Sequence, residues 1–126
     1  MTSVLATSAV IAPVPPSFDD EVAISIVTVA ELHFGVMVAT DQAVRGERLR
    51  RLVLLQAEFD PLPVDGPVAI AYGRLAAAVS ETGRQPRARA MDLLIAATAM
   101  AHGARLVTRN GADLAGLEDL IEIVSL

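Results

Sequence analysis

Short apolar segments alternate with helical segments along this chain, and this alternation constrains the fold more than any other feature of the sequence. Strand-like runs of apolar and β-branched residues occur at residues 2–5, 22–27, 106–108 and 121–124. Helical patterns begin at Thr28 and cover residues 42–59, 67–82 and 91–102. Strands separated by helices predict an α/β fold with a mainly parallel sheet covered on both faces. We expect one domain over residues 1–126.

Local signals predict where several of these elements begin and end. Thr28, three residues before Glu31, matches a capping box and predicts the start of the first long helix. Pro67 suits the first turn of the third long helix, whereas Gly83 and Gly103 are typical of residues just past a helix end. The proline-rich run 13–17 and the segment 60–64 are predicted to be irregular or extended.

Composition excludes several classes of protein. Apolar residues make up 53% of the chain, yet no apolar run approaches the roughly 20 residues that a membrane helix needs. The N-terminus carries no secretory signal, so we expect a cytoplasmic protein with no membrane contact. The chain contains no cysteine, so a metal site must use oxygen ligands or the two histidines. A formal charge of −5 argues against bulk coating of nucleic acid, but it is compatible with a local basic patch.

Three acidic residues follow predicted strands. Ligands of parallel sheets bind beyond the carboxyl ends of the strands, and the residues near those ends include Ala6, Glu31, Asp92 and Asp113. Carboxylates that converge raise one another's pKa unless a cation neutralises them, so the cluster predicts Mg²⁺ or Mn²⁺. Such an ion could activate water and stabilise the charge of a phosphodiester displacement.

Each of these residues also has a structural explanation. Glu31 could cap the backbone of Thr28, and Asp92 and Asp113 could interact favourably with helix dipoles. The arginines before Asp92 either contact phosphate at the rim of the site or lie in a solvated loop; they are Arg84, Arg87 and Arg89. Those of residues 42–59 indicate a solvated face or a partner surface. His33 and His102 lack acidic partners at metal-ligand spacing and are interpreted as ordinary helix residues.

Four segments together resemble one family. They are Val4–Ala12, Ile26–Leu32, Asp92–Ala99 and Leu106–Leu114, and they are similar to the four motifs of PIN-domain ribonucleases. The chain most resembles the VapC toxins of bacterial type II toxin-antitoxin pairs. The resemblance covers nearly the whole sequence, and its third and fourth motifs are the most specific.

The resemblance implies a PIN-like three-layer fold and a Mg²⁺-dependent (or Mn²⁺-dependent) endoribonuclease toxin. A cognate antitoxin would hold this toxin inactive. By motif match, the metal-binding and catalytic roles fall on Glu31, Asp92 and Asp113. The residues expected to contact RNA are Arg84, Arg87, Arg89, Thr108 and Asn110.

Ala6 departs from the family pattern, which has a metal-binding aspartate at this position. Because a methyl group cannot coordinate metal, we expect an inactive or weakened enzyme. The alanine is either an engineered substitution or a natural loss, and the intact Thr7-Ser8 pair favours a deliberate or recent loss. One alternative is a catalytically dead module that keeps only an antitoxin-binding or dimerising surface. Another is an unrelated α/β protein whose acids lie far apart.

Two further expectations concern the first helix and association. The segment 13–20 is shorter and richer in proline than its family counterpart, which predicts a truncated first helix. Apolar stripes on several short helices predict a homodimer, or a complex in which a helical antitoxin segment lies in an apolar groove.

Overall fold

Four short strands form one sheet in the computed structural model, which describes residues 2–11 and 20–126. The strands are β1 (Thr2–Leu5), β2 (Glu21–Ile24), β3 (Arg105–Thr108) and β4 (Ile123–Ser125). Their order is β2-β1-β3-β4, and all pairings are parallel. Val4 of the central strand β1 therefore lies between Ala23 on one side and Leu106 on the other. The predicted parallel sheet is confirmed.

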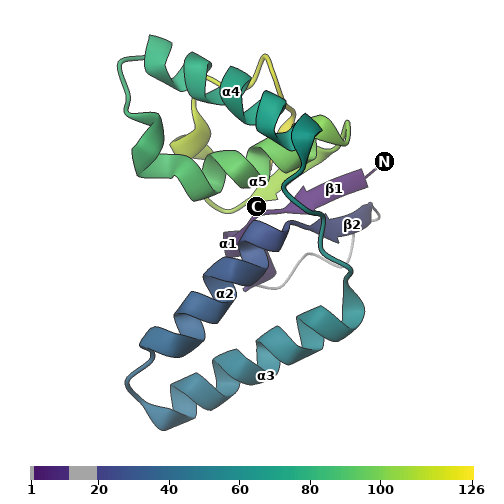
Figure 1. Ribbon diagram of the computed structural model, residues 1–126, viewed down its shortest axis with the longest axis vertical. Coiled ribbons are helices and arrows are strands. Elements are labelled where there is room, and N and C mark those ends of the chain that lie inside the picture. Colours follow the sequence, from purple (N-terminus) through teal and green to yellow (C-terminus); the bar gives the residue numbers. More distant parts are fainter. Residues whose placement is uncertain (1, 12–19) are drawn as a thin grey trace.

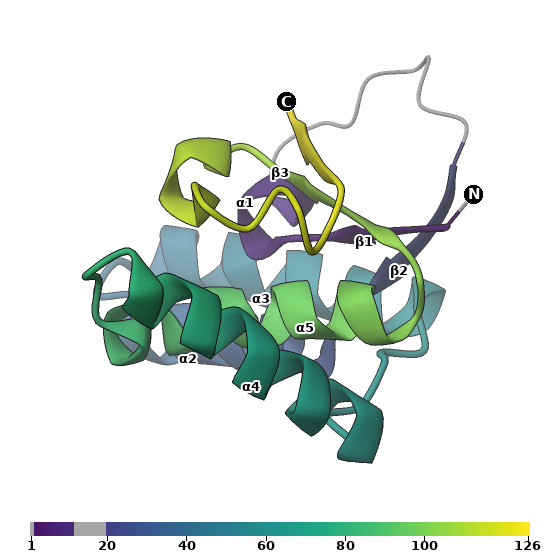
Figure 2. The ribbon, with the colours of Figure 1, turned by 90° about the horizontal axis from the view of Figure 1, so that it is seen from above.

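Helices cover both faces of this sheet. They are α1 (Thr7–Val10), α2 (Ile26–Val38), α3 (Gln42–Glu58), α4 (Gly66–Glu81) and α5 (Ala90–Ala101), with the 3-10 helices η1 (Pro86–Arg89) and η2 (Gly111–Leu114). Figure 1 shows α4 and α5 above the strands and α2 and α3 below them, and Figure 2 shows the same elements from above. The described part of the chain contains no helix with the length and apolar content needed to cross a bilayer.

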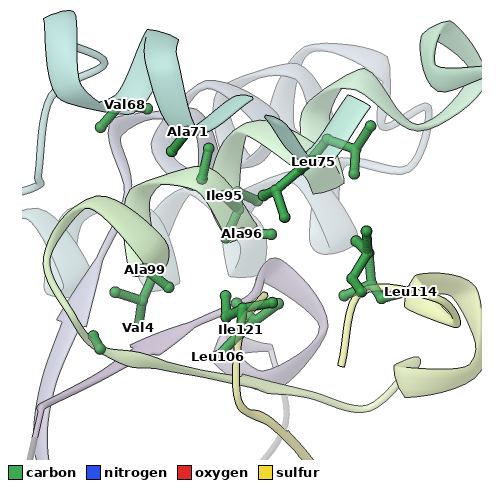
Figure 3. Close-up of a cluster of buried hydrophobic side chains, with 14 of the residues drawn as sticks. Val4, Val68, Ala71, Leu75, Ile95, Ala96, Ala99, Leu106, Leu114 and Ile121 are labelled. Carbon is green, nitrogen blue, oxygen red and sulfur yellow. The ribbon is translucent and has the colours of Figure 1, made fainter. Parts of the chain in front are cut away.

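Alternate side chains of the strands supply the two halves of the core. Val4 and Leu106 pack with residues of α4 and α5 such as Leu75 (Figure 3). Leu5 and Val107, their immediate neighbours, pack with residues of the other helices. This alternation is the period-2 pattern of a strand buried on both faces, so the fold has three layers.

The boundary between β2 and α2 differs from the prediction. The strand predicted at 22–27 is observed as β2, but its predicted end and the helix start at Thr28 are wrong, because β2 ends at Ile24 and α2 begins at Ile26. Ser25 caps the helix by accepting a 3.0 Å hydrogen bond from the Val27 N–H. The Ile26 N–H donates to the Leu62 carbonyl at 2.9 Å, so this donor is satisfied without a longer strand.

Most other boundaries agree with the prediction to within two residues. Asp65 caps α4, and Gly83 lies just past its end with a φ of 83° that favours glycine. Gly103, with a φ of 61°, follows α5 in the same way. The predicted strand 121–124 is observed as β4. The predicted irregular run 13–17 lies outside the described residues, as does most of the segment expected to hold a truncated first helix.

A polar cluster joins the amino ends of the strands, at the opposite edge from the acidic residues. Asp20, just before β2, accepts hydrogen bonds from the buried Ser3 hydroxyl and from Arg105 Nε, and it pairs with Arg105 Nη2. Arg105 Nη1 also lies 3.7 Å from Glu122 Oε1, just before β4. The Ser3 hydrogen bond, followed by Arg105, lowers the pKa of Asp20 although burial opposes this.

This cluster predicts acid-sensitive stability. Because the pKa of Asp20 is lower in the folded chain, its stabilising contribution is complete above the ordinary carboxyl pKa and is lost as the pH falls through the lowered value. We expect Asp20→Asn to remove this part of the pH dependence. Urea unfolding of both forms from neutral to acid pH measures the difference. Parallel stability curves for the two proteins over that range would contradict the assignment.

Candidate metal and RNA site

A cavity of about 240 Å³ lies at the carboxyl edge of the sheet. Its wall includes all three predicted acids together with Ala6. The other lining residues are Thr7, Ser8, Ile11, Ile95, Leu106, Thr108, Asn110 and Leu114. The acids therefore do not lie on opposite faces of the sheet, which removes the alternative of an unrelated protein with scattered carboxylates.

Ala6 stands where β1 ends and α1 begins. Its N–H donates to the Val107 carbonyl at 2.8 Å, and its own carbonyl accepts from the Ala9 N–H at 2.9 Å. These backbone bonds fix the half-buried Ala6 at the cavity wall between two strands. Its side chain contributes only a methyl group where the motif comparison expects a carboxylate.

Glu31 is held by α1. It lies in the second turn of α2, and its Oε1 accepts a 2.6 Å hydrogen bond from the Thr7 hydroxyl. The Thr7 hydroxyl also lies 3.2 Å from that of the buried Thr28. The capping interpretation of Glu31 is wrong, because Ser25 caps this helix and Glu31 is six residues further on. Its carboxylate is oriented toward the cavity by Thr7 instead.

Asp113 lies in η2 and contacts Arg89 of η1, the 3-10 helix before α5. Arg89 Nη1 lies 3.3 Å from Asp113 Oδ1 and donates a 2.8 Å hydrogen bond to the Asp113 carbonyl. One arginine thus fixes both the backbone and the carboxylate of this residue. Arg89, one of the predicted phosphate contacts, is paired with Asp113 at the protein surface and positions it.

Asp92 is the third residue of α5 and carries the perturbed carboxyl of the site. Partial burial raises its pKa, the nearby Asp113 charge raises it further, and Arg89 lowers it. Two carboxylates near one another favour either a proton or a cation between them. The pKa of Asp92 should therefore fall when a cation is present in the cavity.

This perturbation predicts that Asp92→Asn stabilises the metal-free chain. A raised carboxyl pKa means that the ionised form costs folding free energy at neutral pH, and the cost disappears as the pH falls below both pKa values. We expect a gain of less than about 1 kcal/mol, because Asp92 is exposed enough for water to screen its charge. Chemical denaturation in EDTA measures it. Asp119→Asn, at an exposed residue outside the cavity, is the matched control, and an equal gain there would contradict this explanation.

The cavity suits a hard divalent cation in the kind of its ligands but not in their present spacing. Carboxylate oxygens are the donors that Mg²⁺ and Mn²⁺ prefer. Within residues 2–11 and 20–126, however, no three acidic or histidine side chains lie close enough together to hold an ion as they stand. His33 and His102 are exposed and do not line the cavity, so they do not complete the set.

The side-chain hydroxyls of Ser8 and Thr108 brace the same edge, and only Thr108 is among the residues predicted for the site. The Ser8 hydroxyl lies 3.2 Å from the Thr108 hydroxyl and accepts a 3.0 Å hydrogen bond from the Arg109 N–H. The Thr108 hydroxyl accepts from the Asn110 N–H at 3.0 Å, which turns the chain toward Asp113. Thr7 and Ser8 could have been predicted as site residues, because they come just after Ala6 at the end of the first strand.

The other residues predicted to contact RNA differ in whether they line the cavity. Asn110 lines the cavity and is exposed, whereas Thr108 is 3% exposed and lies within the brace. Arg87 lines a neighbouring hollow that also includes Glu31 and Asp92. Arg84 is exposed and lines neither the cavity nor this hollow.

Comparison with known proteins adds an independent result. Residues 6–118 match the PIN domain family. The chain is 38% identical over 99 residues to Ribonuclease VapC5 of Mycobacterium tuberculosis strain ATCC 25618 / H37Rv, covering 79% of this chain and 70% of the relative. It is 33% identical over 103 residues to Ribonuclease VapC4 of the same strain, covering 82% and 75%.

Solved structures give the same answer. A crystal structure of VapBC-5 from Mycobacterium tuberculosis, a member of the VapBC family of toxin-antitoxin systems, superposes with a TM-score of 0.85 at 34% identity. That match covers 99% of this chain and 98% of the other. FitAcB from Neisseria gonorrhoeae superposes with a TM-score of 0.73 at 26% identity, covering 97% and 96%. The chain therefore belongs to the PIN domain family, and within that family it is a relative of the VapC ribonucleases.

Proposed function

We propose that this chain is a metal-dependent endoribonuclease toxin of a VapBC-like pair, weakened or inactivated by Ala6. The observation that carries the proposal is the convergence of Glu31, Asp92 and Asp113 on one cavity beside Ala6. The names of its relatives, which are ribonucleases, support the activity.

In this proposal the three carboxylates bind Mg²⁺ or Mn²⁺ and Asn110 contacts the RNA. A divalent ion held there would activate a water and stabilise the charge that develops on the phosphate. The chain's own groups position the ligands: Thr7 orients Glu31, and Arg89 fixes Asp113. Arg87 supplies positive charge at the rim, where it can bind phosphate without neutralising the metal ligands.

The second candidate function is a catalytically dead module, and a specific observation favours it. The cavity has a methyl group at Ala6, and the described residues contain no ready cluster of three metal ligands. Such a module would keep its partner-binding surfaces. An assay for cleavage of total cellular RNA in Mg²⁺ separates the two functions. It compares this chain, Ala6→Asp, and Ala6→Asp combined with Glu31→Gln.

The proposal includes a protein partner and self-association. The VapBC-5 structure belongs to a toxin-antitoxin family, which supports a cognate antitoxin for this chain. Exposed apolar side chains on α2 and α3 support a homodimer or an antitoxin complex; they include Met37, Val53 and Leu54.

A further inference from the structure

Three hollows meet at Glu31. The first is the acidic cavity, and the second, of about 380 Å³, extends along η1 and the start of α5 past Arg87 and Met91. The third, of about 590 Å³, is lined by Thr7, Ala30, Glu31, Phe34 and Met91. Thr7 and Glu31 belong to both the first and the third hollow. A molecule that fills the third hollow is therefore in contact with the wall of the acidic cavity.

The third hollow is apolar and has an aromatic wall. Phe34 is one of only three phenylalanines in the chain, and it is 68% exposed. Ala30 lies one helical turn before it, which leaves the ring face uncovered on that side, and Met91 of α5 is 50% exposed across the hollow. A flat, polarisable apolar surface of this kind is suited to stacking against a ring.

The second hollow supplies a cation at the other side of Glu31. Arg87 is exposed, and within residues 2–11 and 20–126 its guanidinium forms no hydrogen bond or ion pair. Arg89, by contrast, is tied to Asp113. Three features therefore lie next to Glu31. They are an acidic cavity whose carboxylates could bind a metal ion, an arginine that could bind phosphate, and an exposed aromatic surface.

We propose that the Phe34 hollow binds one unpaired base of an RNA substrate while Arg87 holds a neighbouring phosphate. The inference rests on the proposed ribonuclease function and adds to it two residues, Phe34 and Arg87, that would position the RNA. A paired base has both faces stacked within a duplex and cannot lie against a ring. An apolar protein segment could fill the third hollow alone, but it would leave the adjacent arginine unused. A nucleotide chain uses the arginine and the ring together.

The test measures binding of a fluorescent single-stranded oligoribonucleotide of about 12 nucleotides by anisotropy, in Mg²⁺ and in EDTA. We expect Phe34→Leu to weaken binding by about tenfold, because base stacking on an aromatic ring contributes on the order of 1–3 kcal/mol. Phe34→Tyr, which keeps the ring, should bind as the original chain does. Met37→Ala is the matched control, since Met37 is an exposed residue of the same helix that lines none of the three hollows.

The same RNA annealed to its complement should bind equally to all four proteins. Since Phe34 is largely exposed, thermal unfolding should show that Phe34→Leu folds as the original chain does. Unchanged single-strand affinity in Phe34→Leu, or equal losses in Phe34→Leu and Met37→Ala, would overturn the base subsite and leave the hollow to a protein partner. A failure of the base subsite and a failure of the nuclease function are told apart by an RNA cleavage assay. The assay compares Ala6→Asp with the double variant that also carries Phe34→Leu. Equal cleavage by both forms overturns the subsite alone, whereas no cleavage by Ala6→Asp overturns the nuclease function.

Discussion

Ala6→Asp is expected to tighten Mg²⁺ binding by at least about tenfold, or 1.4 kcal/mol, and to produce or strongly increase RNA cleavage. Ala6 lines the cavity with Glu31, Asp92 and Asp113, and its backbone is fixed by the hydrogen bond to Val107. A carboxylate added at this point raises the number and the charge of the oxygen ligands. Calorimetric titration with Mg²⁺ and an RNA cleavage assay measure the two effects.

The stability of the same variant should depend on metal. A fourth carboxylate adds repulsion to a cavity in which Asp113 already raises the pKa of Asp92, so Ala6→Asp should unfold more easily in EDTA. Added Mg²⁺ should stabilise Ala6→Asp more than the original chain, because an ion bound only by the folded state shifts the equilibrium by mass action. Ala6→Asn, similar in size but uncharged, is the matched control. Equal Mg²⁺ affinity and equal cleavage in the alanine and aspartate forms would show that Ala6 does not occupy the assigned position.

Leu75→Ala is expected to lower the free energy of unfolding by about 3 kcal/mol. Leu75 is fully buried on α4 and packs in the cluster that joins α4, α5 and the sheet (Figure 3). Truncation removes apolar contacts and leaves a cavity that the surrounding helices fill only in part. For a chain of this size the loss corresponds to a fall of roughly 10 °C in Tm. Urea unfolding and calorimetry measure both quantities.

Ile70→Ala is the control for this core prediction. Ile70 lies on the same helix, but it is 70% exposed, so its truncation should change stability by less than about 0.5 kcal/mol. Comparable losses in Leu75→Ala and Ile70→Ala would contradict the packing described for α4. They would indicate that Ile70 is covered in solution, for example by a second protein.

Much of the fold could be predicted because local signals and burial agree. The helix 91–102 is observed as α5, Ala90–Ala101, since its buried apolar face and the following Gly103 both favour those limits. The start of α2 could not be predicted in the same way. Ile26 and Val27 are β-branched and favour a strand, but the Ser25 cap and the contact with Leu62, far along the chain, place them in a helix.

The candidate site, like the fold, could be predicted only in part. The convergence of the three acids follows from parallel topology, since the carboxyl ends of such strands share one edge. Side-chain contacts are a different matter. That Arg89 is engaged with Asp113 and Arg87 is not depends on where the fold places η1 relative to η2, and no spacing in the sequence distinguishes these two arginines. The exposure of Phe34 likewise depends on which face of α2 its neighbours cover.

The central position of β1 has a consequence for when the acidic cavity can form during synthesis. β1 pairs with β3, about a hundred residues later, so this part of the sheet cannot form until Arg105–Thr108 has left the ribosome. Thr7 and Ser8 are translated about a hundred residues before Thr108 and Asp113. A nascent chain therefore carries Glu31 well before Thr108 and Asp113 complete the cavity. Late closure of this kind separates the emergence of Glu31 from the assembly of the complete cavity.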